Sequence, residues 1–121
     1  MLLHVVQVPI IVDPLGMGME SMAQAVAIDE KVSSRRLKRL AASFRREGFE
    51  VRSVCQVGGP VSIVLTQATR LRADLIVLGS HGRGAVYDLL VGSTAQGVLR
   101  RATCPVVVVP SRENTSRRPR R

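Results

Sequence analysis

The stretch that decides the fold runs from Gly79 to Pro110 and reads GSHGRGAVYDLLVGSTAQGVLRRATCPVVVVP. Its small residues follow the spacing Gly79-x2-Gly82-x9-Gly92-Ser93. An apolar run at residues 75–78 leads into the first glycine, and a helical pattern opens after Ser93. Small residues let backbone N–H groups approach an anion, and the start of a helix supplies unpaired N–H donors and a positive dipole end. The pattern predicts a phosphate site between a strand and a helix.

Upstream of this stretch, strand and helix patterns alternate along the chain. Leu2–Val6 is a short apolar, β-branched run that predicts a strand. From about residue 20 to residue 44, apolar side chains recur at helical spacing. This predicts one long or broken amphipathic helix that Gly48 ends. Residues 49–57 alternate between apolar or small and mostly polar side chains, as in a half-exposed strand at a sheet edge.

Gly58 and Gly59 then turn the chain, and Pro60 is favoured as the first residue of a second helix. The predicted buried stripe of that helix consists of Val61, Val64, Leu65, Ala68 and Leu71. Residues 75–78 and 106–109 are uninterrupted apolar runs, as expected for strands buried on both faces, with a helix predicted between them at 95–102. This order predicts an α/β domain over residues 1–110, with a parallel sheet, helices on both faces and right-handed crossovers.

The composition favours an aliphatic core and argues against base stacking. Of the 121 residues, 45% are hydrophobic but only 2% are aromatic, and none is Trp. Single-stranded nucleic-acid binders usually present aromatic platforms, for which this sequence has too few rings. The net charge is +9, and residues 112–121 contribute five Arg against one Glu. We expect residues 111–121 to form a basic disordered tail, and we expect anionic partners.

The cysteines and the apolar segments bear on the compartment. Cys55 and Cys104 lie in or beside apolar strand patterns and form no CxxC pair, so we expect both to be reduced and structural. No stretch approaches the roughly 20 apolar residues of a membrane span. The first residues also lack the basic region and cleavage site of a signal peptide. These features predict a cytoplasmic protein.

Two segments carry a family signature: LGSHGRG at residues 78–84 and LLVGSTAQGVLRRATCPVVVVP at residues 89–110. Together with the strand at Leu2–Val6 and the turn before Pro60, they make residues 2 to about 110 resemble the universal stress protein family (UspA domain). The resemblance implies a parallel sheet sandwiched by helices, similar to the adenine nucleotide alpha hydrolase and Rossmann folds. It also implies ATP binding, because one branch of the family binds ATP through Gly-x2-Gly-x9-Gly-[Ser/Thr].

The resemblance assigns a role to each residue of the implied ATP site. Residues 78 and 79 would border the ribose and phosphates, and Gly82 would lie against the phosphate chain. Residues 92–94 would donate backbone and hydroxyl hydrogen bonds, and the backbone of Val5 would meet the adenine edge. The implied cofactor is ATP, with or without Mg²⁺. The implied cofactor-binding residues are Val5, Leu78, Gly79, Gly82, Gly92, Ser93 and Thr94.

The chain departs from the family pattern at its N-terminal side. A usual member begins with a strand that ends near an Asp of the adenosine pocket, followed by a helix, and only then reaches the strand that Leu2–Val6 matches. The first strand is central in the family's sheet, so this chain would have about four strands. Three explanations stay open. The reading frame starts upstream of Met1, which we favour; a partner chain supplies the strand; or the sheet closes with four strands.

Several other residues suggest chemistry but fit a plainer role. We expect His81 to be an exposed loop residue and His4 to pack in the core. Ser93 is expected to cap a helix rather than to accept a phosphate, and Asp88 to be a solvated acid, because one carboxylate does not make a magnesium site. The basic runs between residues 35 and 46 are expected to form the solvated face of the long helix.

These observations favour a cytoplasmic regulatory module of the stress response that binds ATP and is not an enzyme, because no catalytic constellation is visible. The alternative is an ATP-independent, dimerising interaction protein of the same family, with an incomplete nucleotide site. The resemblance also implies a homodimer through the last strand, Cys104 to Val109. No metal site and no membrane contact are expected. Nucleic acid is expected as a partner only non-specifically, through the Arg-rich tail.

Overall fold

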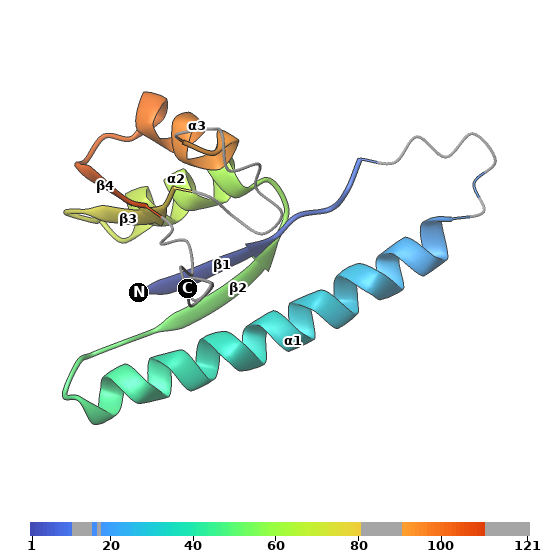
Figure 1. The fold of residues 1–121 in the computed structure, drawn as a ribbon, viewed down its shortest axis with the longest axis horizontal. Helices are drawn as coiled ribbons and strands as arrows, with labels where there is room; N and C mark the ends of the chain where they lie inside the picture. The colour runs from blue at the N-terminus through green and yellow to red at the C-terminus, as the bar shows by residue number, and fades with distance from the viewer. Residues whose placement is uncertain (11–15, 17, 81–90, 111–121) are drawn as a thin grey trace, which may run out of the picture. The chain divides into compact units, whose positions relative to one another are not determined.

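The computed structural model describes residues 1–10, 16, 18–80 and 91–110 (Figure 1). These residues divide into two compact units, with the boundary between Val64 and Leu65. Strands and helices alternate along the described chain, which confirms an α/β fold. The elements are β1 (Leu2–Val6), α1 (Met19–Arg46), β2 (Ser53–Val57), α2 (Pro60–Arg70), β3 (Ile76–Gly79), α3 (Ser93–Arg101) and β4 (Val106–Val109).

In the first unit, α1 packs along a parallel pair of strands (Figure 1). β1 and β2 run in register from Leu2 opposite Ser53 to Val6 opposite Val57. The 28 residues of α1 make a helix about 42 Å long, whereas a five-residue strand spans only about 17 Å. The helix therefore reaches well beyond the strands. Its buried residues, Ser33 and Ala41, lie two turns apart on one face.

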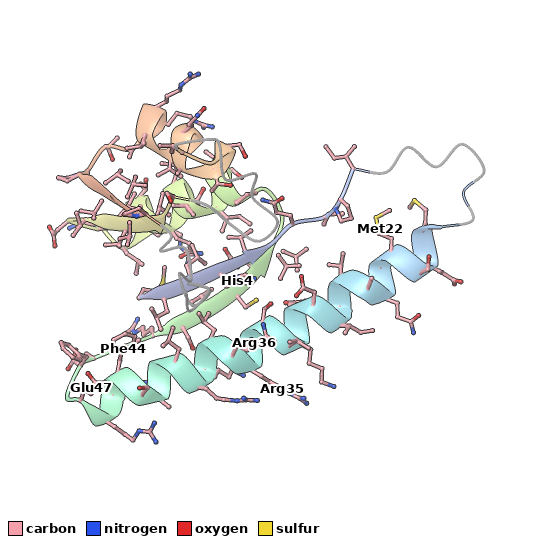
Figure 2. The ribbon with its side chains drawn as sticks, viewed as in Figure 1. His4, Met22, Arg35, Arg36, Phe44 and Glu47 are labelled. Carbon is pink, nitrogen blue, oxygen red and sulfur yellow. The ribbon has the colours of Figure 1, made fainter. Side chains whose placement is uncertain are left out.

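The C-terminal end of α1 is closed by a glycine cap. Gly48 has a φ of 94°, and its N–H donates to the carbonyl of Arg45 at 3.0 Å. The N–H of Phe49 donates to the carbonyl of Phe44 at 3.1 Å. These two bonds define a Schellman motif, in which a left-handed residue folds the chain back over the last turn. The rings of Phe44 and Phe49 meet edge to face, 6.2 Å apart, and Figure 2 shows Phe44 and Glu47 at this end.

The cap explains why β2 is shorter than predicted. A strand was expected from residue 49, but β2 begins at Ser53. The N–H of Phe49 is used by the helix cap and cannot join a strand ladder. The Arg45 guanidinium fixes the residues that follow, because its Nε and Nη2 donate to the carbonyl of Val51 at 2.8 and 2.5 Å. Residues 49–52 thus serve the helix end, although their alternation fits a strand.

The second helix, α2, begins at Pro60 as predicted. Gly58 precedes it with a φ of 148°, and a Cβ there would lie 3.0 Å from the Ile63 side chain. The expected stripe is only half-buried at its four helical positions, and it is wrong at Leu71, which lies beyond the helix and is 46% exposed. Gln67 is buried in place of a further apolar residue.

In the second unit, α3 contacts β4 of a second parallel strand pair (Figure 1). β3 and β4 run in register from Ile76 opposite Val106 to Gly79 opposite Val109. Ala95 and Val98 on α3 are buried, as is Ile76 on β3. Burial on both faces was predicted for these strands and is wrong for the described residues. Val77 is 59% exposed, and two valines of β4, Val107 and Val109, are also exposed.

The four described strands form two separate parallel pairs rather than one sheet. β1 bonds to β2 and β3 bonds to β4, with no ladder between β1 and β3 among the described residues.

Candidate functional site

Two short backbone hydrogen bonds meet at Ser80, one linking the end of β3 to β4 and one linking it to the start of α3. The N–H of Ser80 donates to the carbonyl of Val109 at 2.7 Å, which extends the β3–β4 ladder by one residue. The carbonyl of Ser80 then accepts the N–H of Gly92 at 2.6 Å. Ser80 is 5% exposed. The first and last glycines of the predicted motif are thus held at one place, although twelve residues separate them along the chain.

α3 starts without a side-chain cap. Its N-cap residue is Gly92, with extended backbone angles, φ −68° and ψ 162°. The first helical bond runs from the N–H of Gln96 to the carbonyl of Gly92 at 3.0 Å. Gln96 also donates from Nε2 to the carbonyl of Val91 at 3.2 Å, which steadies the entry to the helix. The N–H groups of the first helical turn have no acceptor within the helix itself. They are therefore available to an anion.

The electrostatics of α3 favour an anion at this end. The first turn contains no acidic residue, and Arg100 and Arg101 lie in the last turn. The helix dipole places partial positive charge at the N-terminus. Ser93 is exposed and Thr94 is half-buried, so both hydroxyls start the helix near its surface. The expected capping role of Ser93 is wrong, because Gly92 holds the N-cap position and Ser93 is the first helical residue.

The structure gathers five of the predicted site residues in the second unit. Leu78 and Gly79 end β3, and residues 92–94 start α3. Gly82 lies outside the described residues, as do His81 and Asp88. Val5 belongs to β1 of the first unit. Sequence reasoning missed Ser80, whose backbone joins the two elements, because the bond involves no side chain and leaves no signal in residue type.

The backbone of Val5 points away from β2. The N–H of Leu2 donates to the carbonyl of Arg52, and the carbonyl of Val6 accepts the N–H of Gly58. In a parallel ladder alternate residues bond to the same neighbour, so Leu2, His4 and Val6 serve β2. The N–H and carbonyl of Val5 therefore face the opposite edge of β1, with no ladder partner among the described residues.

The residues around Cys55 form a structural cluster. Cys55 pairs in register with His4, which is half-buried, and its thiol lies 3.9 Å from the carbonyl of Glu30 on α1. Burial raises the pKa of the Cys55 thiol, and the charges of Glu30 and Asp29 raise it further. Both Cys55 and Cys104 are free, as predicted. A raised pKa disfavours the thiolate, so Cys55 is a poor nucleophile.

Across residues 1–10, 16, 18–80 and 91–110, no three His, Cys, Asp or Glu side chains gather closely enough to hold a metal ion. None of the helices in those ranges combines the length and the apolar character needed to cross a membrane.

Comparison with known proteins shows to which family the chain is similar. The model of the universal stress protein family matches residues 1–110. A universal stress protein of Thermus aquaticus is 38% identical over 86 residues, which cover 66% of this chain and 62% of that protein. One from Methanocaldococcus jannaschii is 33% identical over 73 residues, covering 60% of this chain and 43% of its own length.

A solved structure agrees with the fold. The universal stress protein UspA of Lactobacillus plantarum superposes with a TM-score of 0.76 at 21% identity, covering 88% of this chain and 74% of that one. The chain thus spans about two fifths to three fifths of the length of these two sequence relatives and three quarters of this solved structure. On the match over residues 1–110, the chain belongs to the universal stress protein family.

Proposed function

We propose that this chain is a cytoplasmic regulatory module of the stress response that binds ATP without rapid turnover, with the phosphates at the turn between β3 and α3. One observation carries the proposal. The 2.6 Å bond from the Gly92 N–H to the Ser80 carbonyl brings the two ends of the glycine motif together beside the uncapped start of α3. Glycines, free N–H donors and a positive dipole end at one point form a phosphate cradle.

Each described residue of the cradle has a distinct task in this proposal. The N–H groups of Ser93 and Thr94 donate to phosphate oxygens, and their hydroxyls add further hydrogen bonds. Gly79 and Gly92 carry no side chain that would occupy the space of the phosphates. Leu78, half-buried at the end of β3, offers an apolar surface to the ribose. When Mg²⁺ accompanies ATP, the phosphate oxygens supply its ligands.

Val5 fits the role of reading adenine. Its N–H and carbonyl are not used by the ladder with β2, so they form a donor and acceptor pair on an apolar strand. Adenine presents a matching acceptor and donor on one edge. Val5 thus offers, within the first unit, the backbone donor and acceptor that the family resemblance assigns to adenine.

A second candidate function is ATP-independent dimerisation through β4. Val107 and Val109 are 44% and 49% exposed on one face of β4. The N–H groups of Ile76 and Ser80 bond to the carbonyls of Pro105 and Val109, so Val106 and Val108 direct their backbone groups to the outer edge. An antiparallel β4 from a second copy would satisfy that edge. Val107→Lys should then shift the sedimentation profile toward monomer, and an unchanged profile would count against this interface.

Calorimetric titration with ATP tests the first proposal. The unmodified chain should bind, and Gly92→Glu should abolish binding, because a carboxylate at the cradle repels the phosphates. Ser62→Glu is the matched control, since it adds the same charge in the exposed first turn of α2 and should leave binding intact. Absence of heat with the unmodified chain, or equal loss in both variants, would overturn the nucleotide site and leave dimerisation as the function.

A further inference from the structure

The second half of α1 carries a dense, one-sided positive charge. Between Lys31 and Arg46 the helix has seven Lys or Arg residues and no Asp or Glu. Five of the seven recur at helical spacing and share one side, which we call the basic face. The basic face consists of Lys31, Arg35, Lys38, Arg39 and Arg46, all of them exposed.

Packing of the first unit directs this face away from the strands. The residues of α1 buried against β1 and β2 are Ser33 and Ala41. Arg35 and Arg39 lie roughly on the opposite side of the helix, given 3.6 residues per turn. Figure 2 shows Arg35 on the side of α1 remote from the two strands.

The charges of the basic face are not neutralised within the described chain. None of its five side chains has a hydrogen bond or ion pair there. Arg45, outside the face, is instead engaged with the carbonyl of Val51. Lys31 and Arg35, and likewise Arg35 and Arg39, are like charges four residues apart, an arrangement that destabilises a helix. The helix dipole offsets cations only in the last turn, so helix stability does not account for this pattern.

We propose that the basic face binds the phosphate backbone of duplex nucleic acid, independently of sequence. From Lys31 to Arg46 the helix rises about 22 Å, a length over which a duplex presents about 13 phosphates. Three of the five cations are Arg, whose guanidinium fork matches phosphate oxygens. The chain has 2% aromatic residues, so its contact is with backbone rather than stacked bases.

The geometry favours nucleic acid over a lipid surface. A helix that lies in a membrane interface buries an apolar face while its cations meet the headgroups. The side of α1 that carries Ser33 and Ala41 instead packs against β1 and β2, and its one aromatic residue, Phe44, packs on Phe49. The exposed apolar residues Ile28, Val32 and Leu40 add no aromatic anchor to the basic face. The basic face is thus a charged surface on a helix that is already docked.

Fluorescence anisotropy with a labelled duplex of about 24 base pairs tests the proposal between about 50 and 200 mM salt. The variant Arg35→Gln/Lys38→Gln/Arg39→Gln should reduce the slope of log affinity against log salt by about two to three units, and weaken binding near 100 mM salt by about a hundredfold. Gln is a good helix former, so α1 should persist, which circular dichroism checks. Lys31→Gln/Arg46→Gln should act in the same direction through different residues.

The matched control is Arg52→Gln/Arg70→Gln/Arg72→Gln, which removes the same charge from exposed positions outside α1. It should retain the slope. Equal loss in both triple variants would overturn the proposal in favour of net charge alone. Loss of duplex binding on removal of residues 112–121, together with no effect of the substitutions in the basic face, would also overturn it. So would association with anionic lipid vesicles in the absence of association with the duplex.

Discussion

Two helix ends that carry a glycine, the C-terminus of α1 and the N-terminus of α3, differ in what the glycine does there. At Gly48 the left-handed backbone lets two N–H groups return to the last turn, and the rings of Phe44 and Phe49 contact each other beside it. At Gly92 the backbone is ordinary extended chain, and no side chain caps the helix. Gly48 lets the last carbonyls of α1 accept hydrogen bonds, whereas Gly92 leaves the first N–H groups of α3 without a side-chain acceptor. The backbone angles explain the glycine at position 48, whereas at position 92 they do not, which leaves the lack of a side chain at Gly92 to be explained by the proposed phosphate site.

The largest expected effect is on the cap of α1. Gly48→Ala places a Cβ on a left-handed residue, which should lower the free energy of unfolding by about 1–2 kcal/mol. Urea denaturation measures it. Glu47→Ala is the adjacent control, because Glu47 has a φ of −84° and should change stability by less than about 0.5 kcal/mol. ATP binding should survive Gly48→Ala. Loss of ATP binding in this variant would contradict the conclusion that only the glycine at the start of α3 serves the nucleotide.

The second effect concerns the aromatic cover of the same cap. Phe49→Leu keeps an apolar residue but removes the edge-to-face contact with Phe44. We expect a loss of about 1 kcal/mol in the free energy of unfolding. The double variant with Phe44→Leu should cost less than the sum of the two single changes, since the pair interaction is lost only once. Strict additivity in thermal unfolding would show that the rings do not interact.

The third prediction sets stability against binding at α3. Gly92→Asp supplies a favoured N-cap residue and an acid at the positive end of the dipole. The free energy of unfolding should rise by about 0.5 kcal/mol, while ATP affinity should collapse because the carboxylate occupies the phosphate position. Paired denaturation and calorimetry measure both quantities. A Gly92→Asp variant that is less stable, or that still binds ATP, contradicts the proposal that α3 lacks a side-chain cap because phosphates bind at its N-terminus.

The smallest effect is the titration of Cys55 in the first unit. Burial, then the charges of Glu30 and Asp29, raise its pKa, so the thiol stays protonated in the folded chain while the unfolded thiol ionises first. Its contribution to stability is therefore present below the unfolded pKa and is lost as pH rises past it. In a Cys104→Ser background, Glu30→Gln should speed alkylation of Cys55 by less than about threefold. Glu47→Gln should leave the rate unchanged, and a slower rate in Glu30→Gln would reverse the assigned sign.

Local patterns predicted most of the elements. β1 was predicted at Leu2–Val6 and lies there, Pro60 starts α2, and Gly48 ends the long helix. These features depend on residue type alone, because proline fixes φ and glycine tolerates positive φ. The start of β2 was predicted wrongly, since the alternation from Phe49 onward also suits a helix cap that packs Phe49 on Phe44.

The candidate site was predicted in part. The spacing from Gly79 to Gly92 pointed to a cradle, and the structure places both glycines beside the start of α3. The role of the Ser80 carbonyl escaped prediction because a backbone acceptor is common to every residue. The direction of the Val5 backbone groups, away from β2, also became known only from the register of the β1–β2 ladder.

The sequence by itself determined the family, the order of strands and helices, and the composition of the phosphate turn, because each is written in residue type and spacing. Only the tertiary structure decided which strands pair and which faces are covered. The unbroken apolar runs at residues 75–78 and 106–109 are the same whether one face or two are buried, and in the described chain Val77 and Val107 lie exposed. Pairing and burial depend on contacts between residues far apart along the chain, and these contacts become defined only when the backbone has folded.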